Sequence, residues 1–119
     1  MGYELHVVHT ESWLESAGRP ITRAEVDAVV QADPELSWSK TDHLNGLYDF
    51  IEWNGQSFYY WDRDQIIGKN LLEPQILKLS KIALALGANL VGDDGEKYTY
   101  RRSFWGRERV VEEKIYSRR

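Results

Sequence analysis

The dipeptide Asn54-Gly55, set between two aromatic-rich runs, is the feature that most constrains how this chain can fold. Asn-Gly is the preferred pair for a two-residue type I′ turn, because both central residues of that turn need positive φ. The flanking runs therefore predict an antiparallel hairpin over residues 47–61. The register that follows from this turn pairs Trp53 with Gln56, Glu52 with Ser57, Ile51 with Phe58, Phe50 with Tyr59, Asp49 with Tyr60 and Tyr48 with Trp61.

Two helices are marked by the residues at their ends. Thr22 and Glu25 have the spacing of a capping box, so a helix is expected to begin at Thr22. Pro34 ends it, because the residue before a proline disfavours helical dihedral angles. A second helix is expected to have Pro74 in its first turn and Gly87 just past its end, with apolar residues at helical spacing between them. We expect this second helix to be the main core helix.

Short apolar and β-branched runs predict the remaining strands. They lie at 3–8, at 65–67, at 88–91 and 97–100 around an Asp94-Gly95 turn, and in the first part of 101–119, whereas 11–20 is expected to be a loop. The elements together predict an α+β fold. We expect a small antiparallel or mixed sheet of about five strands, with two helices packed on one face.

Charge is distributed unevenly along the 119 residues, although the net charge is only −4. Residues 1–100 hold 16 acidic and 8 basic side chains, whereas residues 101–119 hold 7 basic and 3 acidic ones. We expect one domain over 1–119 with a basic C-terminal extension at 101–119, and an acidic body that attracts basic partners rather than nucleic acid. The lack of cysteine and of long apolar runs favours a cytoplasmic protein without a membrane partner.

No residue pattern in the sequence points to catalysis, a cofactor or a metal. His6 and His9 are three apart, so on a strand they face opposite sides of the sheet and cannot share a metal. The acidic segment 93–96 is too short for a calcium loop and is explained by turn chemistry. We therefore expect no enzymatic activity, cofactor or metal. A small enzyme or ligand-binding domain with a site near His43 is the alternative, and nucleic-acid contact through the basic tail is another.

The aromatic hairpin is the best candidate for a binding surface. Five tryptophans and seven tyrosines exceed what a small core needs, so one face of the sheet could present rings to a partner. The alternative is that both faces are buried, the second beneath the tail with Phe104 and Trp105. The predicted contact residues combine hairpin rings with the nearby acidic side chains, and they are Trp53, Tyr59, Trp61, Asp62, Asp64, Asp93, Asp94 and Glu96.

Three stretches, 1–5, 21–36 and 82–96, resemble a loosely defined group of small bacterial proteins. The last is the most specific, since it contains the pattern LGAxxxGDDGE at 86–96, whereas the tail from Arg101 departs from the group. Members of this group are suspected to be immunity proteins of polymorphic-toxin or type VI effector systems, which bind and block a toxin delivered between cells. The resemblance implies a cognate toxin as partner and supplies no catalytic residue.

These observations predict an immunity-type binding protein that neutralises a cognate toxin by occluding its active site. The acidic face would steer a basic catalytic domain toward the protein, and the aromatic residues would form the desolvated centre of the contact.

Overall fold

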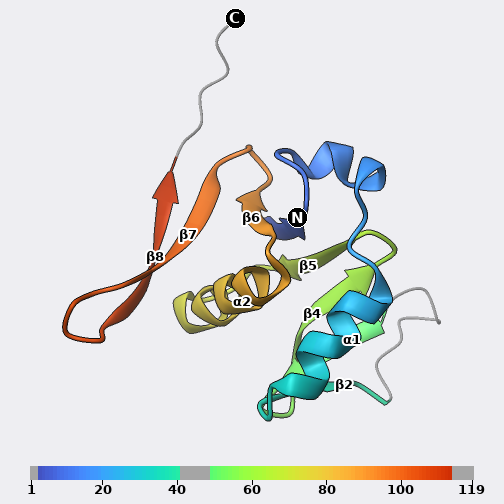
Figure 1. Ribbon diagram of the computed structural model, residues 1–119, viewed down its shortest axis with the longest axis horizontal. Coiled ribbons are helices and arrows are strands. Elements are labelled where there is room, and N and C mark those ends of the chain that lie inside the picture. Colours follow the sequence, from blue (N-terminus) through green and yellow to red (C-terminus); the bar gives the residue numbers. More distant parts are fainter. Residues whose placement is uncertain (1–2, 41–48, 114–119) are drawn as a thin grey trace, which may run out of the picture.

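The computed structural model describes residues 3–40 and 49–113, which form one antiparallel sheet and three helices. The eight strands of the sheet lie in the order β2-β3-β4-β5-β1-β6-β7-β8 (Figure 1). They are Glu4–Val8 (β1), Leu36–Trp38 (β2), Asp49–Trp53 (β3), Gln56–Asp62 (β4), Gln65–Lys69 (β5), Asn89–Gly92 (β6), Lys97–Arg102 (β7) and Glu108–Glu113 (β8). The α+β class is confirmed, but the expected number of strands is wrong. The sheet is wider because the three-residue β2 adds an unpredicted edge strand, and because all the predicted strand-like runs, including that of β8, join the same sheet.

The helices are Trp13–Gly18 (η1, a 3-10 helix), Arg23–Ala32 (α1) and Glu73–Leu86 (α2). The capping box of α1 is present: the Thr22 hydroxyl accepts the N–H of Glu25, and the Glu25 carboxylate accepts the N–H of Thr22. Gly87 ends α2 in the left-handed conformation, at φ 65°. The prediction of a loop over 11–20 is wrong, because Ser12 caps η1 by accepting the N–H of Leu14. None of the helices within 3–40 and 49–113 is long and apolar enough to cross a membrane.

The turn of the β3–β4 hairpin is as predicted, with positive φ at Asn54 (52°) and Gly55 (85°). The two pairs next to the turn, Trp53–Gln56 and Glu52–Ser57, are also confirmed. Beyond them the register is wrong by one residue, because a β-bulge lies between Ile51 and Glu52. The observed pairs are Ile51–Tyr59, Phe50–Tyr60 and Asp49–Trp61, and Tyr48 lies outside the described residues.

The β6–β7 hairpin is present, but its turn differs from the predicted one. The Gly92 carbonyl accepts the N–H of Gly95 at 3.0 Å, and the Gly92 N–H donates to the Glu96 carbonyl at 2.8 Å. Asp93 and Asp94 are therefore the central turn residues, rather than Asp94 and Gly95. Gly95 follows them at φ 88°, as in a three-residue hairpin loop that closes with a bulge.

Helices α1 and α2 pack on the same face of the sheet (Figure 1). The core between them and the strands is formed by Leu5, Val7, Ile21, Val26, Val30, Leu36, Ile51, Tyr59, Ile66, Leu79, Ile82, Ala83 and Leu90. Because side chains alternate along a strand, His6 points to the opposite face from Leu5 and Val7. The Trp13 ring of η1 stacks on the His6 ring there, with centroids 4.5 Å apart. The centre of the sheet is thus covered on both sides.

Candidate functional site

The loop between β7 and β8 is a defined turn that presents two aromatic side chains. The Ser103 carbonyl accepts the N–H of Gly106 at 2.9 Å, and the Arg107 carbonyl accepts the N–H of Ser103 at 2.7 Å. Gly106 has φ 86°, so this loop repeats the turn and closing bulge of the β6–β7 loop. Phe104 and Trp105 occupy the central positions, where side chains point away from both strands.

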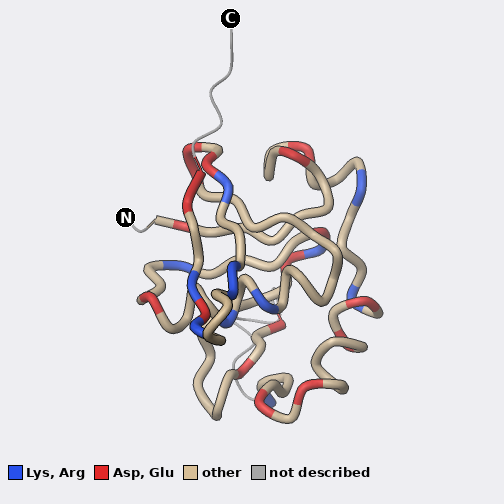
Figure 2. Tube along the Cα trace, turned by 60° about the vertical axis from the view of Figure 1, so that its left-hand side comes forward, with Lys and Arg blue, Asp and Glu red and all other residues tan. Residues whose placement is uncertain are grey.

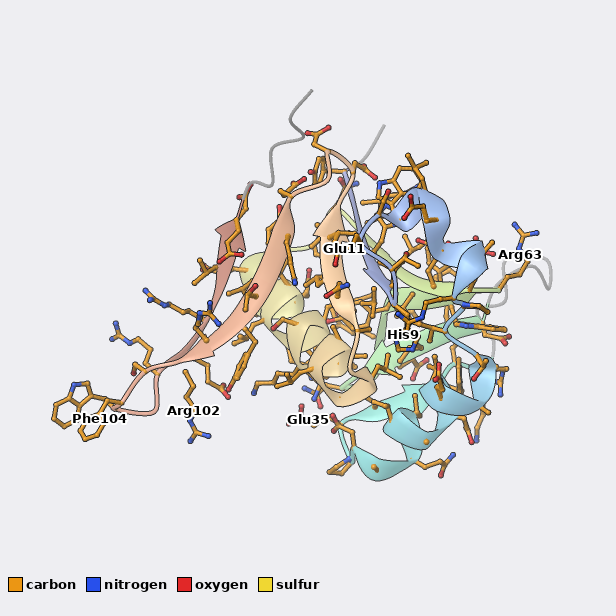
Figure 3. The ribbon with its side chains drawn as sticks, turned by 45° about the horizontal axis from the view of Figure 1, so that its top comes forward. His9, Glu11, Glu35, Arg63, Arg102 and Phe104 are labelled. Carbon is orange, nitrogen blue, oxygen red and sulfur yellow. The ribbon has the colours of Figure 1, made fainter. Side chains whose placement is uncertain are left out.

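Phe104 and Trp105 are the two most exposed large hydrophobic side chains among the described residues, at 94% and 87% of their full exposure. Their rings meet edge to face, with centroids 5.3 Å apart and an interplanar angle of 82°. Figure 3 shows Phe104 at the far end of the hairpin, directed away from the body of the molecule. A contiguous pair of exposed rings is a feature of binding surfaces, because its burial against a partner removes a large apolar area from water.

Four arginines flank this aromatic pair, and all four side chains are exposed. Figure 2 shows basic positions close together along the β7–β8 hairpin. An open pocket of about 540 Å³ beside the tip is lined by Ser103, Trp105, Arg107 and Arg109. Residues 101–109 hold these four arginines and one acidic residue, so the tip is basic although the chain as a whole is acidic. We call residues 101–109 the basic aromatic tip.

The acidic residue of the tip, Glu108, links the hairpin to α2. Its carboxylate accepts the hydroxyl of Tyr100 at 2.6 Å and lies 2.9 Å from the Lys81 ammonium on α2. The hydrogen bond from Tyr100, and then that from Lys81, hold the pKa of Glu108 below its usual value, so the carboxylate is charged near neutral pH. Because Glu108 pairs with Arg102 next to the turn, these contacts hold the hairpin to α2 just below Phe104 and Trp105.

The structure separates the predicted aromatic contact residues. Tyr59 is wholly buried, and its hydroxyl donates to the Gln75 carbonyl at 2.7 Å. The bulge in β3–β4 puts Tyr59 on the core face opposite Ile51, so the ring is not available to a partner. Trp53 and Trp61 are half-buried against the core, and the Trp61 indole donates to the Ile21 carbonyl. These rings belong mainly to the core instead of an open face.

The predicted acidic contact residues are also divided. Glu96 is buried, and its carboxylate accepts hydrogen bonds from the hydroxyls of Tyr3 and Tyr98. The prediction that Glu96 contacts a partner is therefore wrong, because the side chain is inside the fold. Asp64 accepts the Ser16 hydroxyl at 3.0 Å. Asp62 is half-buried beside Arg63, whereas Asp94 is exposed. Together with the rings, this shows that the predicted residues do not form one surface.

Asp93 joins a polar cluster on the sheet face that η1 covers. Its Oδ1 lies 2.9 Å from Nε2 of His6, and its Oδ2 accepts the N–H of Glu4 at 2.9 Å. Burial raises the pKa of Asp93, but the hydrogen bonds from His6 and Glu4 outweigh it and hold the pKa below its usual value.

His43, the centre of the alternative site, lies outside the described residues.

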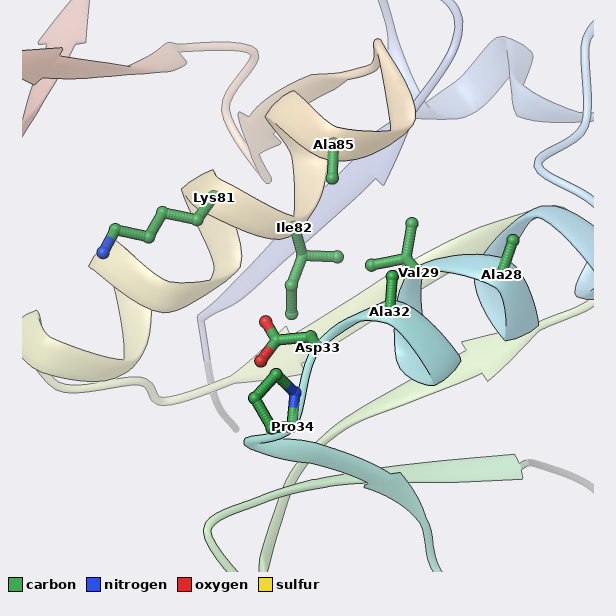
Figure 4. Close-up of a pocket in the computed structure, with 8 residues that line it drawn as sticks. All are labelled: Ala28, Val29, Ala32, Asp33, Pro34, Lys81, Ile82 and Ala85. Atoms are coloured by element: carbon green, nitrogen blue, oxygen red, sulfur yellow. The ribbon is translucent and has the colours of Figure 1, made fainter.

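A second pocket, of about 490 Å³, lies between α1 and α2 (Figure 4). Its two charged lining residues are already paired, Asp33 with Lys78 and Lys81 with Glu108. The remaining lining is mostly apolar and is formed by Ala28, Val29, Ala32, Pro34, Ile82 and Ala85. Such a lining supplies neither a nucleophile nor an acid–base pair.

Sequence reasoning missed the basic aromatic tip, for which the available signals were Gly106 and the two strand-like runs on either side of it. The alternative that Phe104 and Trp105 cover the second face of the sheet is wrong, because both rings are exposed. No protein family, no curated protein and no solved structure matches the chain. The site must therefore be interpreted from its own geometry and charge.

Proposed function

We propose that this protein is an immunity-type binding protein of the cytoplasm, which neutralises a toxin by inserting its β7–β8 hairpin into the toxin's active-site groove. The observation that carries the proposal is the exposure of Phe104 and Trp105 at the tip of an anchored hairpin. The resemblance of three stretches to suspected immunity proteins supports the class of partner. The surface itself supports binding rather than catalysis.

The tip has the composition of an interface hot spot, in which aromatic side chains and arginines carry most of the binding energy. Phe104 and Trp105 would fill an apolar pocket of the partner, and the four arginines would pair with acidic groups around its rim. The positive charge of the tip favours a groove that is acidic at this point, within a toxin that is otherwise expected to be basic. Exposed Asp94 and the half-buried Asp62 stay on the body of the protein, where they would face basic parts of the same toxin.

The hairpin is held before binding, which reduces the entropic cost of docking. The Glu108 contacts to Tyr100 and Lys81 hold the strands next to the turn, and the Ser103 and Gly106 hydrogen bonds fix the turn itself. Removal of an interface hot-spot side chain typically costs 2 kcal/mol or more, roughly a 30-fold loss of affinity. We therefore expect Phe104→Ala with Trp105→Ala to weaken toxin binding by at least that factor.

The experiment takes a neighbouring gene product that is toxic when expressed alone and co-expresses it with this protein to measure protection. Surface plasmon resonance then measures the affinity of the pair. The double variant should fail to protect cells and should keep the wild-type melting temperature, because rings so exposed contribute little to the folded state. Leu14→Ala is the matched control, since Leu14 is an exposed large hydrophobic residue on η1, outside the hairpin. A double variant that binds and protects like wild type would refute the assignment of the tip.

Nucleic acid is the second candidate ligand, because exposed rings beside arginines can also stack on bases and contact phosphates. The same double variant separates the two candidates when it is tested with a random single-stranded oligonucleotide at increasing salt. Tip-dependent binding that falls steeply with salt, without any tip-dependent toxin binding, would favour nucleic acid.

A further inference from the structure

The buried imidazole of His6 has each ring nitrogen placed against a specific oxygen. Its side chain is only 2% exposed. Nδ1 lies 2.6 Å from Oε1 of Gln65, and Nε2 lies 2.9 Å from Oδ1 of Asp93. The stacked Trp13 ring covers one face of the imidazole at a centroid distance of 4.5 Å. The ring therefore has one orientation, set by β5, η1 and the β6–β7 turn.

A chain of hydrogen bonds shows that Nδ1 of His6 carries a proton. The Gln65 amide nitrogen donates to the Ser16 hydroxyl at 3.1 Å, and that hydroxyl donates to the Asp64 carboxylate at 3.0 Å. The amide nitrogen is thereby turned away from His6, so Gln65 presents its carbonyl oxygen to Nδ1. Nδ1 must donate the proton in that contact. Nε2 faces the Asp93 carboxylate at 2.9 Å, so a proton or another cation must lie between these two acceptor atoms.

Two carboxylates converge on Nε2 of His6. The backbone N–H of Glu4 holds Oδ2 of Asp93 and leaves Oδ1 turned toward the ring. Oε1 of Glu4 is 4.0 Å from Nε2, and one ligand atom from each of the three residues lies within 4.8 Å of the others. Zinc bonds of 2.0–2.2 Å in a tetrahedron put ligand atoms about 3.3–3.6 Å apart. Binding of an ion would therefore require Glu4 to move closer to Nε2 and Asp93 to move slightly away from it.

We propose that Glu4, His6 and Asp93 form a binding site for a divalent transition-metal ion such as Zn²⁺. One imidazole and two carboxylates are suitable ligand types, and a water would complete the tetrahedron where Glu4 and Asp93 reach the surface. Gln65 would act in the second shell, since a metal-bound histidine usually donates its other N–H to an oxygen. The cation would also offset two negative charges, which have Lys69 as a neighbour at 3.6 Å from Glu4.

The proposal differs from the expectation of no metal because the ligands are far apart in the chain. His6 and Asp93 are separated by 87 residues, and the antiparallel pairing of β1 with β6 brings them together. A bound ion would tie β1 to the β6–β7 turn, the connection that leads into the β7–β8 hairpin. Its role would be structural, and it is independent of whether the hairpin binds a toxin.

Isothermal titration calorimetry, with ZnCl2 added to untagged, chelator-treated protein, measures the affinity and the number of bound ions. We expect one ion per chain, a rise in melting temperature, at least a 10-fold loss of affinity in Glu4→Gln, and a complete loss in His6→Gln. His9→Gln is the matched control, because His9 faces a single carboxylate, that of Glu25 at 3.3 Å. Glu4→Gln keeps the proposal testable if removal of the buried His6 prevents folding, since Glu4 is only half-buried.

The competing occupant of the site is a proton, which would make His6 an imidazolium paired with Asp93. Nitrogen-15 NMR of the histidine rings separates the two states. With zinc bound, Nε2 of His6 should have no attached proton while Nδ1 keeps its own. A proton that stays on Nε2 at saturating zinc, or zinc binding that is unaffected by Glu4→Gln, would overturn the proposal.

Discussion

Lys78 on α2 bridges two acidic residues that follow α1, and its removal gives a stability change that can be worked out from the structure. Its ammonium lies 2.7 Å from Oδ2 of Asp33 and 2.8 Å from Oε1 of Glu35. The Lys78 side chain is 10% exposed, and that of Asp33 is 29% exposed. Asp33 also caps the C-terminal end of α1, where the helix dipole disfavours a negative charge. We expect Lys78→Met to destabilise the fold.

The expected loss of unfolding free energy in Lys78→Met lies between the values for an exposed and a buried ion pair. An exposed ion pair contributes about 0–1 kcal/mol, whereas removal of one partner from a buried pair costs about 3–5 kcal/mol. Lys78 is buried but Asp33 still reaches water, and methionine retains most of the apolar stem of the lysine. The free energy of unfolding should therefore fall by about 2 kcal/mol at pH 7.

The loss should depend on pH in a defined direction. Burial raises the pKa of Asp33, but the hydrogen bond and charge of Lys78 outweigh it and leave the pKa below its usual value. A carboxylate whose folded-state pKa is lowered stabilises the protein above its unfolded pKa of about 3.9. That contribution disappears as the pH falls through the folded-state pKa. The difference between wild type and Lys78→Met should therefore shrink at about pH 3.

Urea denaturation followed by tryptophan fluorescence at pH 7 and at about pH 3 measures both effects. Lys69→Met is the matched control, because Lys69 is exposed and lies 3.6 Å from Glu4, so its loss should stay within about 0.5 kcal/mol. If Lys78→Met loses no more than this control at pH 7, or loses as much at pH 3 as at pH 7, the electrostatic reasoning is refuted.

Two further substitutions test the packing of the sheet. Tyr59→Phe should lower the free energy of unfolding by about 1 kcal/mol in urea denaturation, because it removes the hydroxyl that donates to the Gln75 carbonyl, and no loss would contradict that bond's contribution. Gly92→Ala should lower it by about 2 kcal/mol, because the added methyl would lie 2.6 Å from the Tyr3 hydroxyl and closer still to Glu96. An unchanged melting temperature for Gly92→Ala would show that these side chains move aside freely.

Local signals in the sequence were sufficient for much of the fold. The Thr22 capping box and the Asn54-Gly55 turn depend on residues within a few positions of each other, and both are present. The β3–β4 bulge was not predictable in the same way, because counting outward from a turn assumes an unbroken ladder. Phe58 and Tyr59 are adjacent aromatic residues that point to opposite faces of β4, so residue type alone does not show which of them enters the core.

The candidate sites were harder to predict because they depend on exposure and on distant pairing. Exposure of Phe104 and Trp105 follows from their positions in a turn, and the same two rings in a folded-back tail would have covered the sheet. The cluster at His6 depends on the register of β1 with β5 and β6, which no local pattern encodes. The acidic segment at 93–96 was predicted as one surface, yet Asp93 and Glu96 form separate internal contacts.

The chain thus uses its aromatic residues in two different ways. Tyr59 and Trp61 satisfy their polar atoms on backbone carbonyls inside the fold, so their substitution should reduce stability. Phe104 and Trp105 contact each other in water, and the fold gains little from them. Substitution of these two rings should therefore leave the free energy of unfolding almost unchanged and, under the proposed function, weaken binding to the toxin.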